Sequence, residues 1–354
     1  MDRQAQNSGT IEVREAHRFD QAKLEDWLGQ HVAGFAGPLK VEQFKGGQSN
    51  PTYKLATPAR NYVLRRKPPG RLLPGAHAVE REFEVISALR RQRFPVADPI
   101  ALCMDEEVIG TPFYLMAMVE GRIFWDPSFP SIEPGERARY FEAMNDTMAR
   151  LHLIDPAEAG LGAFGKPGNY FERQIARWSK QYAADTEAGR VEAMDRLVEW
   201  LPDNIPAGGD EARIIHGDFR CDNMIFHPER PEVIAVLDWE LSTLGHPLAD
   251  FSYHLMMYRM PAETFSGLGG RDLGALKIPS EQEYVAAYCR RTGRSGIPDL
   301  DFYMAFNLFR LAAILHGIKG RLARGNAASA HAAKMVEGLE PLAELAWRQA
   351  ERAG

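Results

Sequence analysis

Apolar residues at helical spacing predict two helices in the first third of the chain, over residues 19–32 and 78–91. Short apolar runs separated by turn residues predict strands at residues 39–44, 52–57, 61–66, 100–104 and 113–119. Three strands, one helix and two further strands in this order are typical of a compact α+β unit with a mostly antiparallel sheet.

Beyond Gly121 the hydrophobic pattern becomes helical. We expect helices at residues 134–152, 170–186, 192–201, 249–258, 280–291, 300–322 and 327–352. The one expected β interruption is a hairpin within residues 215–240, with a short buried strand at residues 233–237. The pattern therefore predicts three parts: a flexible tail over residues 1–15, a sheet-rich N-lobe over residues 16–120 and a helical C-lobe over residues 121–354.

Composition narrows the class of protein. The 354 residues are 45% hydrophobic and 25% charged, which is ordinary for a soluble globular protein. A net charge of −6 gives no electrostatic reason to expect a nucleic-acid partner. Three scattered cysteines indicate a reducing compartment rather than a disulfide framework. Neither a secretory signal nor a membrane span is visible, so we expect a cytoplasmic protein with no membrane partner.

The segment 215–240 carries the strongest candidate chemistry. His216-Gly217-Asp218 is followed by Asn223 five positions after the aspartate, and Asp238 follows a short apolar run. A strand–loop–strand hairpin would bring these polar side chains to one end. Asp218 could then orient an attacking hydroxyl, while the oxygens of Asn223 and Asp238 hold Mg²⁺, which prefers hard oxygen ligands. We expect His216 to orient the loop, and Asp250 to begin or cap a helix and buttress the loop by hydrogen bonds.

Two stretches of the sheet region have features suited to phosphate binding. Gly46, Gly47 and Ser49 lie in a turn between the first two predicted strands, where backbone N–H groups could close over phosphates. The same residues also suit an ordinary hairpin turn. In the third strand, Val63 and Arg65 point the same way, so Arg65 could reach the phosphates from below. Arg66 is the alternative.

The predicted cation needs a carboxylate partner, and the next helix offers two. Glu82 is the preferred partner of Arg65, and Glu80 is the alternative. Near the end of the sheet region, residues 113–121 would connect the two lobes. There we expect the backbones of Ala117 and Val119 to contact the adenine, although an apolar edge strand would have the same residues.

These motifs resemble the aminoglycoside phosphotransferase and choline kinase superfamily of small-molecule kinases. His216, Asp218 and Asn223 match its HGD-x4-N catalytic loop, and Leu237-Asp238-Trp239 matches its metal-binding strand. The strings YVLRRKPPG and AHAVEREFEV resemble a subgroup whose members occur alone or fused to acyl-CoA dehydrogenases. The likeness runs from about residue 41 to at least residue 251. Where many relatives have lysine as the phosphate-binding cation, this chain has Arg65.

The resemblance implies a protein-kinase-like bilobal fold, with a small antiparallel-sheet N-lobe and a larger helical C-lobe. It also implies ATP with Mg²⁺ and transfer of the γ-phosphoryl group to a small-molecule alcohol, with Asp218 acting on that alcohol. For the subgroup, the implied acceptor is a hydroxyacyl group, including a hydroxyacyl-CoA. The HRD, DFG and APE strings of protein kinases are absent from the sequence, which argues against protein substrates.

Two alternatives to this function remain open: an aminoglycoside or other amino-alcohol kinase, and a non-catalytic ATP-binding regulatory module. A polycationic antibiotic would need clustered carboxylates, and residues 252–286 hold only Glu263, Asp272, Glu281 and Glu283. In the C-terminal helices, Arg310, Lys319, Arg321 and Arg324 could contact the phosphates of CoA or simply form a solvated basic helix end.

Overall fold

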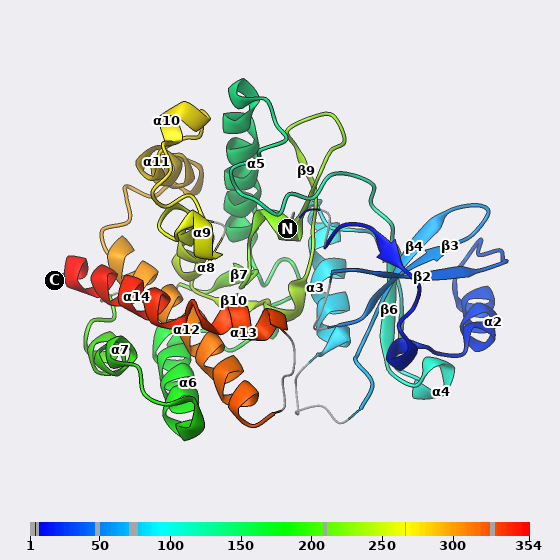
Figure 1. Cartoon of the computed structure of the whole chain (residues 1–354). Coiled ribbons are helices and arrows are strands. Elements are labelled where there is room, and N and C mark those ends of the chain that lie inside the picture. Colours follow the sequence, from blue (N-terminus) through cyan, green and yellow to red (C-terminus); the bar gives the residue numbers. More distant parts are fainter. Residues whose placement is uncertain are drawn as a thin grey trace. The chain divides into compact units, whose positions relative to one another are not determined.

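The computed structural model describes Gln4 and residues 7–46, 50–70, 77–207, 211–265, 267–325 and 330–354. By internal contacts the chain divides into two compact units (Figure 1). The first comprises Met1–Asp126, Ala157–Gly162 and Arg220–Ser242, and the second comprises Pro127–Pro156, Ala163–Phe219 and Thr243–Gly354. The segment of the predicted hairpin is thus grouped with the sheet. The lobe boundaries expected from composition stay a prediction.

An antiparallel six-stranded sheet is the framework of the first unit, in the order β1-β2-β3-β4-β6-β5. Its strands are β1 (Thr10–Ile11), β2 (Lys40–Phe44), β3 (Thr52–Ala56), β4 (Asn61–Arg66), β5 (Pro99–Cys103) and β6 (Phe113–Ala117). The helices of this unit are α2 (Gln21–His31), α3 (Val79–Arg91) and α4 (Glu106–Ile109), with the 3-10 turn η1 (Glu15–His17). Within residues 1–15, for which a tail was expected, β1 pairs with β2.

One face of this sheet packs on α2, and the alternation of β4 shows how. Tyr62 and Leu64 are buried with Leu24 and Leu28 of α2 in one hydrophobic cluster. Because successive side chains of a strand point to opposite faces, Val63 and Arg65 lie on the other face. The side chains of β4 thus alternate between the hydrophobic core beside α2 and the opposite face of the sheet.

A hairpin in the first unit joins β8 (Met224–Phe226) to β9 (Val233–Val236). The backbone N–H of Leu237 donates to the carbonyl of Asn223 at 2.8 Å, just beyond the paired strands. Asn223 and Asp238 therefore begin and end the same hairpin, as the sequence predicted. The remaining 3-10 turns here are η3 (Cys221–Asn223) and η4 (Trp239–Leu241).

The second unit is mainly helical, and it is built around the long helix α12 (Leu300–Ala323). This helix packs on α14, α8 and α6, with α14 alongside it in Figure 1. The other helices are α5 (Pro134–Leu153), α6 (Tyr170–Ala184), α7 (Glu192–Asp203), α8 (Pro247–Leu255), α9 (Ala262–Phe265), α10 (Leu273–Leu276), α11 (Glu281–Thr292), α13 (Ala330–Val336) and α14 (Leu339–Ala353), with 3-10 turns η2 (Thr186–Ala188) and η5 (Met256–Tyr258). The α+β class is confirmed.

Two sequence expectations for the second unit are wrong. The helix expected over residues 327–352 is divided into α13 and α14. Pro341 explains the break, because proline is tolerated in the first turn of a new helix but not inside a continuous one. The hairpin is also not the one β interruption, since β7 (Arg213–Ile215) pairs with β10 (Thr243–Gly245). None of the described helices combines the length and hydrophobicity that a membrane span requires.

Gly121 follows the sheet region at a point where the chain touches the hairpin. A Cβ atom at this position would lie 2.3 Å from the carbonyl oxygen of Phe226 and 2.5 Å from a methyl carbon of Ile225. Arg122 then exchanges two backbone hydrogen bonds of 2.8 Å with Phe226. Glycine is required here because any side chain would collide with backbone.

We predict that Gly121→Ala lowers the free energy of unfolding by about 1–3 kcal/mol, since the added methyl overpacks this contact. Gly29→Ala is the matched control: its Cβ would meet nothing within 4 Å, and it lies inside α2. That change should stabilise the protein by up to about 1 kcal/mol. Urea unfolding of both variants measures the difference, and equal stability of the two would contradict the proposed role of Gly121.

Candidate active site

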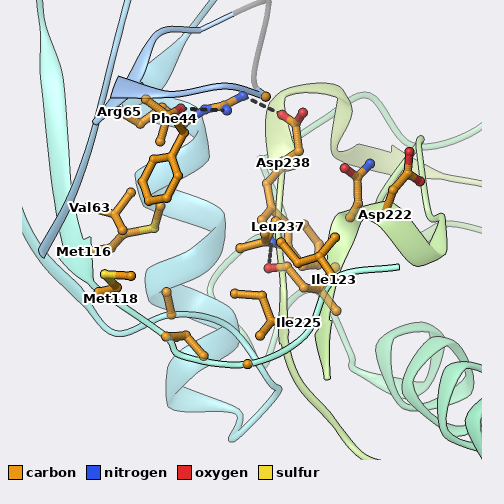
Figure 2. Close-up of a pocket in the computed structure, with 18 of the residues that line it drawn as sticks. Phe44, Val63, Arg65, Met116, Met118, Ile123, Asp222, Ile225, Leu237 and Asp238 are labelled. Atoms are coloured by element: carbon orange, nitrogen blue, oxygen red, sulfur yellow. Dashed lines mark hydrogen bonds and ion pairs between the residues drawn. The ribbon is translucent and has the colours of Figure 1, made fainter. Parts of the chain in front are cut away.

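A pocket of about 460 Å³ lies in the first unit, between the sheet and the hairpin. Figure 2 shows its two sides, with Val63, Met116 and Met118 facing Ile123, Ile225 and Leu237. Arg65, Asn223 and Asp238 also line it. An apolar cleft with a few convergent charged groups is the usual form of a small-molecule site.

Arg65 is the cation of this pocket, and three carboxylates surround it. Its Nε lies 2.9 Å from Glu82 Oε2, and one terminal nitrogen lies 2.5 Å from Asp238 Oδ1 and 3.6 Å from Glu240 Oε2. Burial alone would lower the pKa of the guanidinium, but Asp238 and Glu82 raise it above its ordinary value. Arg65 is therefore a permanently charged group that joins β4, α3 and the end of the hairpin.

Glu82 is also held by neutral donors. One carboxylate oxygen accepts from Asn50 Nδ2 at 2.8 Å, and the other accepts from the Tyr114 hydroxyl at 3.2 Å. Asn50 comes directly after the glycine-rich turn, so Glu82 connects that turn with Arg65. Burial raises the pKa of Glu82 above its ordinary value, against the lowering effect of Arg65.

Arg66 and Glu80, the alternative residues from the sequence, have partners outside the Arg65 cluster. Arg66 is buried on the α2 side of the sheet, where it donates to the carbonyls of Ile109 at 2.9 Å and His17 at 3.2 Å. Glu80 pairs with Lys67 at 3.0 Å. Neither Arg66 nor Glu80 contributes to the Arg65 cluster.

Asp238, two positions after the last residue of β9, has an unusual backbone conformation with φ of +64°. Left-handed backbone in a residue other than glycine costs energy and is concentrated at functional sites. Asn223 and Asp238 both line the pocket and supply amide and carboxylate oxygens. The described residues contain no group of three or more His, Cys, Asp or Glu side chains suited to a metal. Mg²⁺ does not require one, because it is commonly bound through one or two protein ligands and substrate phosphates.

In the second unit, Asp250 organises the backbone before Asp218. Its two carboxylate oxygens accept from the backbone N–H groups of His216 at 2.7 Å and Gly217 at 2.8 Å, and His152 Nε2 lies 3.2 Å away. Burial would raise the pKa of Asp250, but the hydrogen bonds from His152 and His216 lower it. The expected buttress is present. Asp250 does not cap the helix, because His246 is the N-cap of α8.

Asp218 is oriented by side chains that the motif does not contain. The Tyr253 hydroxyl donates to Asp218 Oδ1 at 2.7 Å, and the Asp218 N–H donates to His216 Nδ1 at 3.2 Å. Arg310 donates to the Gly217 carbonyl at 3.0 Å and lies over the Tyr253 ring at 5.3 Å. The Asp218 segment is therefore fixed on both its backbone and its carboxylate.

The residues predicted to bind the nucleotide differ in where the structure places them. Gly46, Ala117 and Val119 line the pocket, whereas Glu82 contributes through Arg65. Gly47 and Ser49 lie outside the described residues. The N–H of Ala117 donates to the Asp98 carbonyl at 2.8 Å, so of its two backbone groups the carbonyl is the candidate for a ligand.

Tyr253, Arg310, Asn50 and Glu240 were not predicted to have these contacts. The sequence did point to Glu240, since it follows Asp238 by two positions. Tyr253, Arg310 and Asn50 each contact a residue far away along the chain. Cys221, which lies between Asp218 and Asn223 in the sequence, is buried, and burial raises its pKa above the ordinary value. That shift favours the unreactive protonated form.

Comparisons with known proteins identify the family of this chain. The sequence model of the phosphotransferase enzyme family matches residues 40–306. The chain belongs to this family. It is 45% identical over 351 residues to the acyl-CoA dehydrogenase family member 10 of Mus musculus, covering 98% of this chain and 32% of that protein. It therefore spans about a third of the length of that relative.

Solved structures extend the family likeness to the fold. A Ralstonia eutropha JMP134 protein, provisionally named an aminoglycoside phosphotransferase, is 50% identical with a TM-score of 0.87, covering 95% of this chain and 99% of that one. A thermostable aminoglycoside phosphotransferase with AMP-PNP and hygromycin B is 13% identical with a TM-score of 0.59, covering 92% and 98%. The fold is the protein-kinase-like fold of the family, and this chain is a member of a family of phosphotransferase enzymes.

We predict that Arg65→Met lowers the free energy of unfolding by about 3–5 kcal/mol, because it leaves Glu82 buried without its cation. Adding Glu82→Gln should recover part of the loss, since the unpaired charge is then removed. Urea unfolding of both single variants and the double variant measures the coupling energy. Strictly additive effects would show that the pair contributes nothing to stability.

His254 should make stability depend on pH. Burial lowers its pKa to about 4, and the ring bridges the Phe219 carbonyl and the Tyr284 hydroxyl. Below about pH 6.5 the unfolded chain binds a proton at this residue that the folded protein does not bind until about pH 4. The contribution of His254 to stability is thus present above pH 6.5 and lost as pH falls through that window, by about 3 kcal/mol in total.

The measurement is urea unfolding from pH 7 to pH 4, compared with His254→Gln. The difference in unfolding free energy between wild type and variant should shrink as pH falls. Parallel pH profiles would rule out this histidine as a source of the dependence.

Proposed function

We propose that this kinase transfers the γ-phosphoryl group of Mg-ATP to the hydroxyl of a hydroxyacyl substrate. The observation that carries the reaction is the convergence of Arg65, Asn223 and Asp238 at one pocket. The match to a relative named for acyl-CoA chemistry supports the acceptor class.

The adenine would bind between the apolar walls, with the Ala117 carbonyl and the Val119 N–H as its backbone partners. The occupied N–H of Ala117 supports this choice of the carbonyl. Arg65 would hold the phosphates, and the turn from Gly46 would cover them. A guanidinium suits phosphate because its donors form a rigid fork.

Asn223 and Asp238 are the residues that would hold Mg²⁺, whose bound charge would neutralise the phosphate oxygens. Asp238 pairs with Arg65 at 2.5 Å. Binding the metal would require Asp238 to exchange this partner, and Glu240 and Glu82 would remain beside Arg65. The cluster thus keeps the cation paired in either arrangement.

Asp218 would orient the acceptor hydroxyl and accept its proton as the oxygen attacks the γ-phosphorus. The carboxylate is suited to this role because Tyr253 fixes one of its oxygens and Asp250 fixes the preceding backbone. Positioning of this kind supplies much of the rate enhancement in phosphoryl transfer. His216 would act through the loop by accepting from the Asp218 N–H.

An aminoglycoside acceptor is disfavoured by the contacts of the acidic residues in segment 252–286. Glu281 pairs with Arg259, with its closest contact at 2.6 Å. Glu283 completes the capping box of α11, and Asp272 caps α10. Three of the four carboxylates therefore have structural partners. The Met- and Tyr-rich stretch that begins this segment is buried core.

The basic residues considered for CoA are also partly committed. Arg310 holds the Gly217 carbonyl, and Arg324 pairs with Asp185 at 2.7 Å. Comparing turnover of free hydroxyacids with turnover of their CoA esters therefore tests whether the CoA ester is required.

The test is ADP release from Mg-ATP with 3- and 4-hydroxyacids, their CoA esters, choline, homoserine and kanamycin. We predict turnover on a hydroxyacyl acceptor and a loss in kcat of about 10²–10⁴-fold in Asp218→Asn, the usual contribution of a general base. ATP binding, measured by calorimetry, should persist in the variant. Asp203→Asn, an exposed residue at the end of α7, is the matched control and should keep wild-type turnover.

The outcomes separate the alternatives. Preference for kanamycin or choline would replace the hydroxyacyl assignment with an amino-alcohol kinase. ATP binding without turnover on any acceptor would favour a regulatory module. Full activity of Asp218→Asn would remove Asp218 from the mechanism.

A further inference from the structure

Asn50 is a fully buried residue whose side chain contacts two of the carboxylates around Arg65. Its Nδ2 donates to Glu82 Oε1 at 2.8 Å and to Glu240 Oε2 at 3.4 Å. The same two carboxylates lie 2.9 Å and 3.6 Å from nitrogens of Arg65. Glu82 and Glu240 are thus satisfied by the Asn50 amide as well as by the guanidinium.

The backbone of Asn50 is connected to the guanidinium through Thr52. The Thr52 hydroxyl donates to the Asn50 carbonyl at 3.0 Å and accepts from Arg65 Nη1 at 3.5 Å. Arg65 Nη2, by contrast, is held by Asp238 at 2.5 Å, the pairing drawn in Figure 2. A long hydrogen bond to a neutral hydroxyl is weaker than a short one to a carboxylate. Since Arg65 and Thr52 both line the pocket, Nη1 is the nitrogen whose bond a ligand oxygen can replace more easily.

His77 determines the orientation of the Asn50 amide. Its Nδ1 lies 2.9 Å from Asn50 Oδ1. An amide oxygen can only accept, so Nδ1 is the donor, and the amide nitrogen is turned toward the carboxylates. Burial, Arg65 and Lys67 lower the pKa of His77, which favours the neutral ring. His77 therefore acts as a neutral N–H donor and adds no charge to the cluster.

The backbone of His77 is left-handed, with φ of +57°. This conformation costs energy in a residue other than glycine, and such residues are concentrated at functional sites. A cost of this kind, at a residue hydrogen-bonded to the Arg65 cluster through Asn50, supports a role in ligand binding rather than in folding alone.

We propose that Asn50 is a positioning residue for Arg65. By donating to Glu82 and Glu240, it holds the guanidinium so that Nη1 can bind a phosphate oxygen of the nucleotide, and His77 fixes the Asn50 amide. This inference rests on the proposed function, which assigns the phosphates to Arg65. It adds two residues outside the catalytic-loop and metal motifs, and neither has to touch the ligand.

The first test is equilibrium binding of ADP and of adenosine to wild type, Asn50→Ala and Asn50→Asp. We expect ADP binding about tenfold weaker in Asn50→Ala, with adenosine binding within about twofold of wild type, because only ADP carries phosphates. Asn50→Asp replaces the donors with a further carboxylate, so ADP binding should weaken at least as much. Equal weakening of both ligands would assign Asn50 to structure alone and overturn the proposal. Unchanged ADP binding in either variant would overturn it too.

The second test asks whether Asn50 acts through Arg65. Arg65→Lys keeps the charge and loses the fork of donors. We expect no further loss of ADP binding when Asn50→Ala is added to Arg65→Lys. Additive losses would show that Asn50 acts independently and overturn its positioning role.

The third test concerns His77. His77→Gly removes the ring without straining the left-handed backbone, and His77→Asn keeps an N–H donor as many bonds from the backbone as Nδ1. We expect ADP binding about threefold weaker in His77→Gly and restored to within about twofold in His77→Asn. Equal binding by the two variants would remove His77 from the proposal. His31→Asn, at an exposed histidine of α2, is the control and should bind ADP like wild type.

Thermal unfolding confirms that each variant is folded. Absence of ADP binding in the wild type would instead contradict the proposed function.

Discussion

The buried guanidinium of Arg65 must be neutralised within the first unit, and much of the pocket follows from that constraint. Arg65 lies on β4, Glu82 on α3, and Asp238 and Glu240 just after the hairpin. A buried charge without partners would be strongly destabilising, so these elements are held together at one point. The same ion pairs that fix the pocket also keep two carboxylates of the hairpin end beside it. Stability and ligand chemistry thus depend on the same side chains.

In the second unit, Asp250 is the buried charge that holds neighbouring segments together, as Arg65 does in the first unit. It is a buried carboxylate whose oxygens accept from the two backbone N–H groups before Asp218, with His152 beside it. Arg310 then holds the carbonyl of Gly217. Backbone groups of an irregular loop need such partners when they are buried. The loop before Asp218 is therefore held in place for the same reason as Arg65. Each buried polar group must keep its hydrogen-bond or ion-pair partners.

Local patterns predicted the features that depend on neighbouring residues. Two-residue alternation in β4 favoured Arg65 but left Arg66 open, and the spacing of Asn223 and Asp238 was enough to predict the hairpin. Features that depend on distant residues were missed. The strands β7 and β10 have three residues each, too few for any periodicity, and each exists only by pairing with the other. Tyr253 carries no local signal either, because its hydroxyl meets Asp218 across 35 positions of the chain. Pro341 did signal the break between α13 and α14, but the apolar pattern across it was continuous.

Recognition of the acceptor depends on other residues than the phosphoryl transfer itself. The residues proposed to bind ATP and Mg²⁺, including Arg65, Asn223 and Asp238, lie in the part of the chain matched by the family. Acceptor recognition depends instead on which polar groups the fold leaves uncommitted. Here Glu281, Glu283 and Asp272 are engaged by an arginine or by helix N-termini, so they satisfy the fold before any ligand. A polycation would have to compete with those contacts. A negatively charged acceptor, such as a hydroxyacyl-CoA, would not compete for these carboxylates. The engaged carboxylates are therefore the physical reason to prefer a hydroxyacyl acceptor to a polycation.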